Sequence, residues 1–278
     1  RARPVKLGVG RSIPRFLGIE GTGDRIAFLI DCSDSMLKPL TPKEVEEIKR
    51  RPTTGGKRYE KKGSADDDAP KEDGTDFSKL LPWDTIETRF DAAREALKLS
   101  LKSLGKDMQY VVILFGHDAE FLAGQGLAYA TEENLRRSTR ALRGLRAKRA
   151  DAEHPHGQLR GYTNAHGALR DAFQVTESGQ LDRDEHVARP GFLEGISTIF
   201  VLSDGAPSWD DFNAVDKNDQ NLNSGNPETG KQGEKAPTLN FYGPYTFVNH
   251  LLRDAIRMNL FRNVEIHCIG IGEANAAL

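Results

Sequence analysis

The sequence predicts an α/β fold, a three-layer sandwich in which helices flank a doubly wound, mostly parallel central sheet. Apolar runs of strand length alternate along the chain with longer stretches of helical periodicity, which is the pattern of a sheet covered on both faces. A hydrophobic content of 37% and a charged content of 29% describe a globular chain, and 278 residues suffice for one sizeable core. We therefore expect a single domain over residues 1–278, with its core at about residues 14–36, 83–207 and 244–278.

The first predicted elements are a strand and a long helix. Residues 25–32 contain an uninterrupted apolar run and predict a buried strand. Apolar side chains recur at helical spacing over residues 84–104, which predicts a helix there. Asp84 and Glu87 have the spacing of a capping box at the start of this helix, and Gly105 ends it.

The remaining elements continue the alternation. Residues 109–115 and 119–122 predict two strands joined as a hairpin. Thr131 is placed to cap a helix that runs to about residue 145. The later elements are predicted as a helix at 163–173, a strand at 197–203, a helix at 244–259 and a strand at 264–271.

Two polar segments interrupt this framework. Residues 37–82 and 208–243 are rich in Lys, Asp, Gly, Pro and Asn and poor in branched apolar residues, so both are predicted to be long irregular loops. Each follows a predicted strand at the same edge of the sheet. They are either tolerated surface insertions or a partner-specific rim around a site at that edge.

Polar side chains gather where the predicted strands end. Asp31, Ser33 and Ser35 directly follow the first strand and offer only oxygen donors, which suits Mg²⁺ and not zinc. Thr163 stands at the start of a predicted helix, and Asp204 ends the strand at 197–203. Because open parallel sheets bind ligands beyond the carboxyl ends of their strands, we expect these three loops to converge.

In these residues, and in their order along the chain, the sequence resembles the von Willebrand factor type A domain of bacterial proteins. That family has a metal-ion-dependent adhesion site made of Asp-x-Ser-x-Ser, a distant Thr and a distant Asp. The resemblance covers the chain from about residue 14 onward, apart from the two polar segments. It implies that the metal ligands are Asp31, Ser33, Ser35, Thr163 and Asp204.

The resemblance further implies a metal-dependent protein-binding module without catalysis of its own. Mg²⁺ or Mn²⁺ is implied, with Ca²⁺ a poorer fit. In the family the Ser and Thr hydroxyls bind the ion directly and the two Asp act largely through water, which leaves a position for an Asp, Glu or C-terminal carboxylate of a partner. Asp34 departs from the family, where a smaller residue is usual, and its charge would weaken binding of an acidic partner.

Other functions remain as alternatives. The module could be a subunit that couples to an AAA+ or chelatase-type ATPase. A metal-dependent hydrolase could use His166 with Asp34 or Asp118, but no paired carboxylates, nucleophile triad or second metal cluster accompany them.

A nucleic-acid surface is a further alternative, which the net charge of −2 does not favour. No aromatic residue interleaves the basic cluster on and after the predicted helix at 131–145, so a solvated helix face is the favoured interpretation. His154 and His156 form a weak metal motif because they lack further ligands. The basic residues are Arg136, Arg137, Arg140, Arg143, Arg146, Lys148 and Arg149.

The two cysteines are predicted to be free, buried thiols, which is compatible with a cytoplasmic location. In the family's sheet order one strand separates Cys32 from Cys268, so they lie roughly 10 Å apart, beyond the limit of about 7 Å between the Cα atoms of a disulfide. No apolar run approaches the roughly 18 residues of a membrane span. The chain begins at Arg1 without a methionine, so we expect a fragment, with any signal peptide or anchor outside it.

Overall fold

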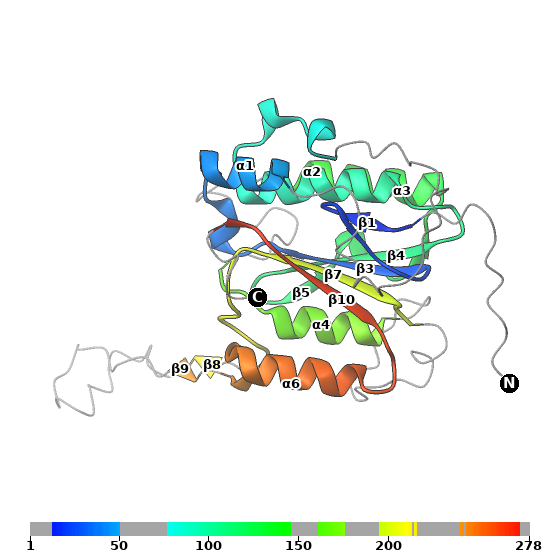
Figure 1. The fold of residues 1–278 in the computed structure, drawn as a ribbon. Coiled ribbons are helices and arrows are strands. Elements are labelled where there is room, and N and C mark those ends of the chain that lie inside the picture. Colours follow the sequence, from blue (N-terminus) through cyan, green and yellow to red (C-terminus); the bar gives the residue numbers. More distant parts are fainter. Residues whose placement is uncertain are drawn as a thin grey trace, which may run out of the picture.

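A six-stranded sheet lies at the centre of the molecule (Figure 1). The computed structural model describes residues 13–50, 77–145, 161–175, 195–212, 214–215, 240–241 and 243–272. The strand order is β10-β7-β3-β4-β5, and β6 also pairs with β4. The strands are β3 (Arg25–Asp31), β4 (Gln109–Phe115), β5 (Ala119–Phe121), β6 (Ala128–Tyr129), β7 (Thr198–Ser203) and β10 (Glu265–Gly270).

The four long strands run parallel, and their register brings their carboxyl ends to one edge. Ile30 of β3 lies opposite Leu114 of β4 and Leu202 of β7, and Ser203 lies opposite Gly270 of β10. Only the short strands β5 and β6 are antiparallel to β4. Residues that follow β3, β4, β7 and β10 are therefore neighbours in space although they are far apart in sequence.

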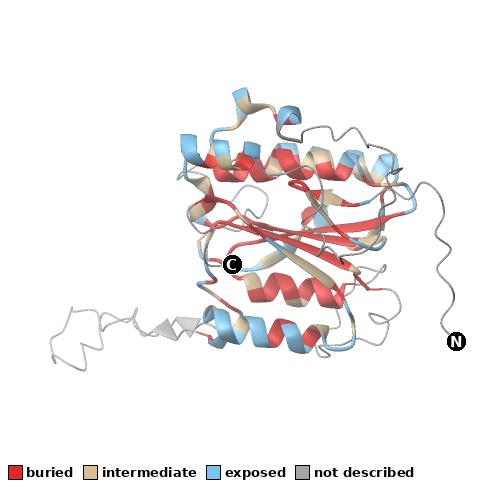
Figure 2. Ribbon diagram, in the orientation of Figure 1, coloured by how far each residue is buried: buried red, intermediate tan, exposed pale blue. Residues whose placement is uncertain are grey.

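Helices cover both faces of the sheet, which confirms the predicted three-layer α/β sandwich (Figure 1). Figure 2 shows that the buried residues concentrate in the sheet and on the helix faces turned toward it. One face carries α1 (Pro42–Arg50), α2 (Arg89–Lys102) and α3 (Glu132–Gly144), and the other carries α4 (Ala165–Gln174) and α6 (Val248–Asn259).

Three aromatic rings form the centre of the core on the α2 face. Phe28 of β3 and Phe200 of β7 stack at 5.6 Å between ring centroids. Phe16 meets both rings edge-on, at 5.5 Å and 6.0 Å. It reaches them from a small hairpin of β1 (Arg15–Phe16) and β2 (Ile19–Glu20) that lies beside the sheet. Aromatic pairs in such arrangements add to the stabilisation from area burial alone.

Helix α2 begins later than predicted. Its N-cap is Thr88, whose side chain accepts a hydrogen bond from the Asp91 backbone while the Asp91 side chain accepts one from the Thr88 backbone. The prediction of a capping box at Asp84 and Glu87 was wrong, because residues 83–85 form a separate 3₁₀ turn, η3 (Trp83–Thr85). Backbone bonds from Leu40 to Glu87 and from Arg89 to Lys38 hold residues 86–88 extended and end that turn before the helix starts.

Two other helices also begin a few residues later than predicted. The helix predicted at 163–173 is α4, which begins at Ala165, and Asn164 caps it by accepting a hydrogen bond from the Gly167 backbone. The predicted helix at 244–259 divides into the 3₁₀ turn η6 (Pro244–Thr246) and α6. The prediction for α3 is confirmed, since Thr131 caps it through the Asn134 backbone.

The first polar segment is not irregular throughout. Residues 42–50 form α1, which begins with a capping box of Thr41 and Glu44 and buries Ile48 in the core. A 3₁₀ turn, η2 (Phe77–Leu80), follows at the other end of the segment, and residues 51–76 lie outside the described part of the chain. Segment 37–82 was therefore wrongly predicted as a loop in its first part, because a capping box and one buried face suffice for a short helix.

The second polar segment is described only in part. A two-residue strand β8 (Ala214–Val215) pairs with β9 (Asn240–Phe241) in an antiparallel ladder. Most of residues 213–242 lie outside the described residues, so the predicted loop at 208–243 stays a prediction over that stretch.

Both cysteines are free, as predicted, and β7 separates the strand before Cys32 from β10. Cys32 is buried, but Cys268 is exposed, because β10 is an edge strand of the sheet. The expectation that both thiols are buried was therefore wrong for Cys268. Among the described residues, no helix is both long enough and apolar enough to span a membrane.

Candidate metal centre

Three loops meet at the carboxyl edge of the sheet. The loop after β3 contacts the loop before α4, since the Asp34 backbone donates to the Gly161 carbonyl at 3.1 Å. The loop after β7 contacts the same segment, since the Ser208 backbone donates to the Thr163 carbonyl at 3.1 Å. The Asn164 backbone donates to the Gly116 carbonyl at 2.8 Å, which ties the segment to the end of β4. The predicted convergence of these loops is therefore observed.

Three of the predicted site residues form one chain of oxygen atoms. The hydroxyls of Ser33 and Ser35 lie 2.9 Å apart. The Ser35 hydroxyl donates to Oδ1 of Asp204 at 2.6 Å. Ser33 and Asp204 are buried, and Ser35 is half-buried. The oxygens of two neighbouring strand ends are thus within hydrogen-bond distance of one another.

Asp31 is a fully buried carboxylate with only neutral hydrogen-bond partners. Its Oδ1 accepts the Ser33 backbone N–H at 2.7 Å, and its Oδ2 accepts the Ser203 hydroxyl at 2.6 Å. Burial raises the pKa of Asp31 to about 6, although these hydrogen bonds act in the opposite direction. A carboxylate in this position gains from a nearby cation, which would favour its charged form.

Thr163 lies in the loop before α4 and is buried. Its backbone N–H donates to the Ser208 hydroxyl at 3.0 Å, and its carbonyl accepts the Ser208 backbone. The loop geometry therefore holds Thr163 beside the segment that carries Asp204. Hydrogen bonds link the other four predicted residues in the order Asp31, Ser33, Ser35 and Asp204. Thr163 lies on the adjoining loop.

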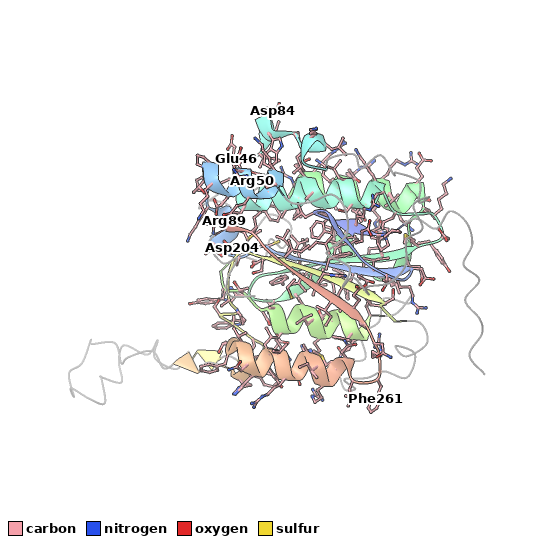
Figure 3. The ribbon with its side chains drawn as sticks, viewed as in Figure 1. Glu46, Arg50, Asp84, Arg89, Asp204 and Phe261 are labelled. Atoms are coloured by element: carbon pink, nitrogen blue, oxygen red, sulfur yellow. The ribbon has the colours of Figure 1, made fainter. Side chains whose placement is uncertain are left out.

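Arg89 and Glu44 belong to the same cluster and were not predicted from the sequence. Nη1 of Arg89 donates to Oδ2 of Asp204 at 2.6 Å (Figure 3). Nε and Nη2 of Arg89 both donate to Oε1 of Glu44, at 3.0 Å and 2.7 Å. Burial alone would lower the pKa of Arg89, but the hydrogen bonds to Asp204 and Glu44 raise it. Glu44 sits three residues after Thr41, a capping-box spacing that could have indicated a helix here, but nothing local indicates its pairing with Arg89.

An aromatic cluster lies next to the loop that carries Thr163. The rings of Tyr162 and Trp209 stack at 4.9 Å, and the His117 ring meets both edge-on, at 4.8 Å and 5.0 Å. Beside it is a cavity of about 740 Å³, whose wall includes Trp209, Asp118 and Arg170. This aromatic cluster was not predicted, because its three rings come from three separate loops.

The donor set fits a hard divalent ion. The cluster offers hydroxyl and carboxylate oxygens, which are the ligands that Mg²⁺ prefers. The loops gather them at the carboxyl edge of the sheet, where Ser35 is half-buried and the other donors are buried. In the described part of the chain no three His, Cys, Asp or Glu side chains are grouped as a metal site would need, so a zinc-type cluster is not seen there. An ion at this centre would depend on serine and threonine hydroxyls as well as on Asp31 and Asp204.

The residues weighed for catalysis are arranged differently. His166 is buried, its Nε2 lies 2.9 Å from Oδ2 of Asp254, and its ring stacks on Tyr245 at 3.6 Å. Burial lowers the pKa of His166 despite the neighbouring carboxylate. These contacts are those of a packed core histidine. Asp34 is exposed and Asp118 lines the separate cavity.

The basic cluster and the histidine pair are only partly described. Arg136, Arg137, Arg140 and Arg143 are exposed on α3, where Arg136 lies 4.0 Å from Glu132 and Arg137 donates to the Ala123 carbonyl. Arg146, Lys148, Arg149, His154 and His156 lie outside the described residues. The described arginines fit a solvated helix face.

Comparison with known proteins gives a distant structural likeness. No protein-family model matches the chain, and no curated protein matches it. The chain is similar to a solved structure described as von Willebrand factor type A from Catenulispora acidiphila, with a TM-score of 0.41 and 15% sequence identity. The match covers 97% of this chain and 43% of that chain, so the chain spans less than half of that protein's length.

Proposed function

We propose that the chain is a divalent-metal-dependent protein-binding module of the von Willebrand factor type A kind, with Mg²⁺ or Mn²⁺ as its ion and Ca²⁺ less suited. The observation that supports this most is the run of oxygen donors from Ser33 through Ser35 to Asp204, next to the buried Asp31. Ser33, Ser35, Thr163, Asp31 and Asp204 would hold the ion. A bound ion would supply a positive charge to which an anionic oxygen can bind.

The proposed partner presents an Asp, a Glu or a C-terminal carboxylate. Three hydroxyls and two carboxylates leave a hexacoordinate ion with room for another anionic oxygen. Asp34 is exposed on the same loop as Ser33 and Ser35, so its negative charge would weaken the binding of an acidic partner. We propose no catalysis of its own, a proposal supported by the packing of His166 against Asp254 and Tyr245.

Isothermal titration calorimetry with MgCl₂ tests the metal site. We expect wild type to bind Mg²⁺ and Ser35→Ala to bind it at least about tenfold more weakly, because a direct donor and the hydrogen bond to Asp204 are both lost. Ser103→Ala, an exposed serine at the end of α2, is the matched control and should bind as wild type does. Absence of Mg²⁺ binding by wild type, or equal affinity in Ser35→Ala, would contradict the proposal.

A pull-down with and without EDTA tests the partner. A protein is bound through the ion if wild type retains it in Mg²⁺ but not in EDTA, and if Ser35→Ala does not retain it. A synthetic peptide of each candidate, in which its acidic residue is replaced by the amide, should then fail to bind. If the amide peptides bind equally well, recognition does not pass through a carboxylate.

A further inference from the structure

We propose that Glu44 and Arg89 are positioning residues that fix the orientation of Asp204 and thereby set the affinity of the centre for its ion. The proposal rests on the metal-dependent function above. Under this proposal α1, which belongs to the first polar segment, contributes to the affinity of the centre for its ion. Figure 3 shows Arg89 and Asp204 side by side at the end of the sheet.

The guanidinium of Arg89 joins two carboxylates that belong to different elements. Glu44 comes from the first turn of α1, and Asp204 follows β7, while Arg89 is the first residue of α2. The side chains of Arg89, Glu44 and Asp204 are 8%, 5% and 0% exposed. Charge-assisted hydrogen bonds between buried groups are directional and strong, so this arrangement has little freedom to rotate.

Each carboxylate oxygen of Asp204 accepts one hydrogen bond from this cluster. Oδ2 accepts from Arg89, and Oδ1 accepts from Ser35 of the proposed centre. Without Arg89, the carboxylate could turn about its last torsion and move Oδ1 away from Ser35. Arg89 thus acts on the ion through Asp204, as residues hydrogen-bonded to metal ligands commonly do.

Glu44 offsets the positive charge of Arg89, which lies beside the proposed cation-binding centre. Asp31, Asp204 and Glu44 can carry three negative charges and Arg89 one positive charge, so the cluster keeps two negative charges for a divalent ion. If Glu44 were neutral, the charge of Arg89 would be balanced by Asp204 alone and would compete with the ion.

Glu44 is itself held in place from the other side. Its Oε2 accepts the Thr41 backbone at 2.6 Å and the Thr41 hydroxyl at 2.8 Å, while Oε1 faces Arg89. Hydrogen bonds to Thr41 and Arg89 lower the pKa of Glu44 despite its burial. The capping box that starts α1 is therefore continuous with the ion pair, and through it with Asp204.

The decisive variant is Arg89→Gln, because two physical effects predict opposite results for it. Removing a positive charge next to the centre would, by electrostatics alone, tighten Mg²⁺ binding. Loss of the hydrogen bond that fixes Asp204 would weaken it. We expect calorimetry at pH 7.5 to show binding about tenfold weaker than in wild type. Tighter or unchanged binding would overturn the positioning role.

Glu44→Gln provides a second test that keeps the shape of the side chain. We expect Mg²⁺ affinity to fall about fivefold to tenfold, because Arg89 then keeps an unbalanced charge near the ion. Glu46→Gln removes the same charge from an exposed position of the same helix and should stay within about twofold of wild type. Equal effects of the two glutamate variants would contradict the proposal.

Amide hydrogen exchange adds a measurement that separates coupling from simple damage to the fold. Because coupling is reciprocal, Mg²⁺ should slow exchange in α1 of wild type but not in Glu44→Gln. Far-UV circular dichroism without metal checks that each variant is folded. If wild type binds no Mg²⁺, the proposed function fails as well; if wild type binds it and α1 exchanges at the same rate with and without the ion, only this inference fails.

Discussion

At the scale of single residues, Asp31 has the least favourable electrostatic environment of the candidate centre. It is a carboxylate with no exposed surface, and its direct partners are a backbone N–H and a hydroxyl. The folded protein therefore holds its proton more tightly than the unfolded chain does, because burial raises the pKa of Asp31 from 3.8 to about 6. Such a difference links folding to pH.

The metal-free protein should lose stability as pH rises through the interval from about 4 to 6. The contribution of Asp31 is fully present below its unfolded pKa of 3.8 and is lost above its folded pKa of about 6. This pKa difference corresponds to a total loss of about 3 kcal/mol. Urea unfolding in EDTA at pH 4.5 and pH 7.5 should detect about 2 kcal/mol of this loss, because the rest has already occurred at pH 4.5.

Asp31→Asn is the matched control, because it keeps the shape of the side chain and cannot ionise. The pH dependence of wild type minus that of Asp31→Asn isolates the carboxyl group. An identical dependence of stability on pH in the two proteins would show that folding does not raise the pKa of Asp31. Mg²⁺ should stabilise wild type more at pH 7.5 than at pH 4.5, since the ion favours the ionised carboxylate.

The two thiols should differ in reactivity. Cys32 is buried, and burial together with the charge of Asp31 raises the pKa of its thiol. Partial burial raises the pKa of the Cys268 thiol too, but Cys268 is exposed on the edge strand and is therefore accessible. We expect N-ethylmaleimide to modify Cys268 first and Cys32 only in urea. Mass spectrometry of the labelled peptides reads both sites in one experiment, and early labelling of Cys32 would contradict its burial.

Residue types at the site could be predicted from sequence, but their ion pairing could not. Asp31, Ser33 and Ser35 form a local pattern, so their proximity follows from spacing along one loop. Arg89 pairs with residues 45 and 115 positions away, and no local spacing relates them. Only the packing of α1 and α2 over the end of β7 brings these charges together.

At the scale of elements, the start of α2 shows how tertiary contacts choose between two equivalent signals. Asp84 with Glu87 and Thr88 with Asp91 both have capping-box spacing. The chain uses the second pair, because residues 38–40 form backbone hydrogen bonds with residues 87–89 and keep that stretch extended. The helix existed in the prediction, and its boundary depended on contacts outside it.

Thr88→Ala should lower the free energy of unfolding by about 1 to 2 kcal/mol, because the buried cap leaves the Asp91 backbone without its acceptor. Asp84→Ala is the control. Asp84 is exposed on η3, so its replacement should change stability by less than about 0.5 kcal/mol. Chemical unfolding of the two variants compares the observed cap with the one that spacing alone suggests. A larger loss in Asp84→Ala would place the helix start where the sequence pattern put it.

Helix α6 has an exposed apolar stripe in addition to its buried face. Leu252 is 55% exposed and Met258 is 2% exposed, although both are large apolar residues of one helix. Leu252→Glu should therefore change stability by less than about 0.5 kcal/mol, whereas Met258→Ala should cost about 2 to 5 kcal/mol through the cavity it leaves. Thermal unfolding of both variants measures the contrast. Comparable losses of stability in the two variants would show that the apolar stripe containing Leu252 is buried in solution.

At the scale of the whole molecule, alternation of strands and helices was enough to predict the sandwich. The strands β3, β4, β7 and β10 lie within one or two residues of their predicted bounds. For β3, β4 and β7 the reason is that continuous apolar runs mark strands buried on both faces. The open edge of β10 was harder to infer, since Cys268 sits in a pattern that also suits a buried strand. The α1 helix was missed because most of its segment is polar.

Gly272, in the turn after β10, lies against the guanidinium of Arg89, with a positive φ of 88°. A Cβ atom there would be 2.6 Å from Cζ of Arg89, so no larger residue fits while the ion pair is intact. The cluster and its close contacts thus draw on segments spread from residue 31 to residue 272. A side chain at position 272 would therefore disturb the ion pair of Arg89 from a turn that contributes no charge to it.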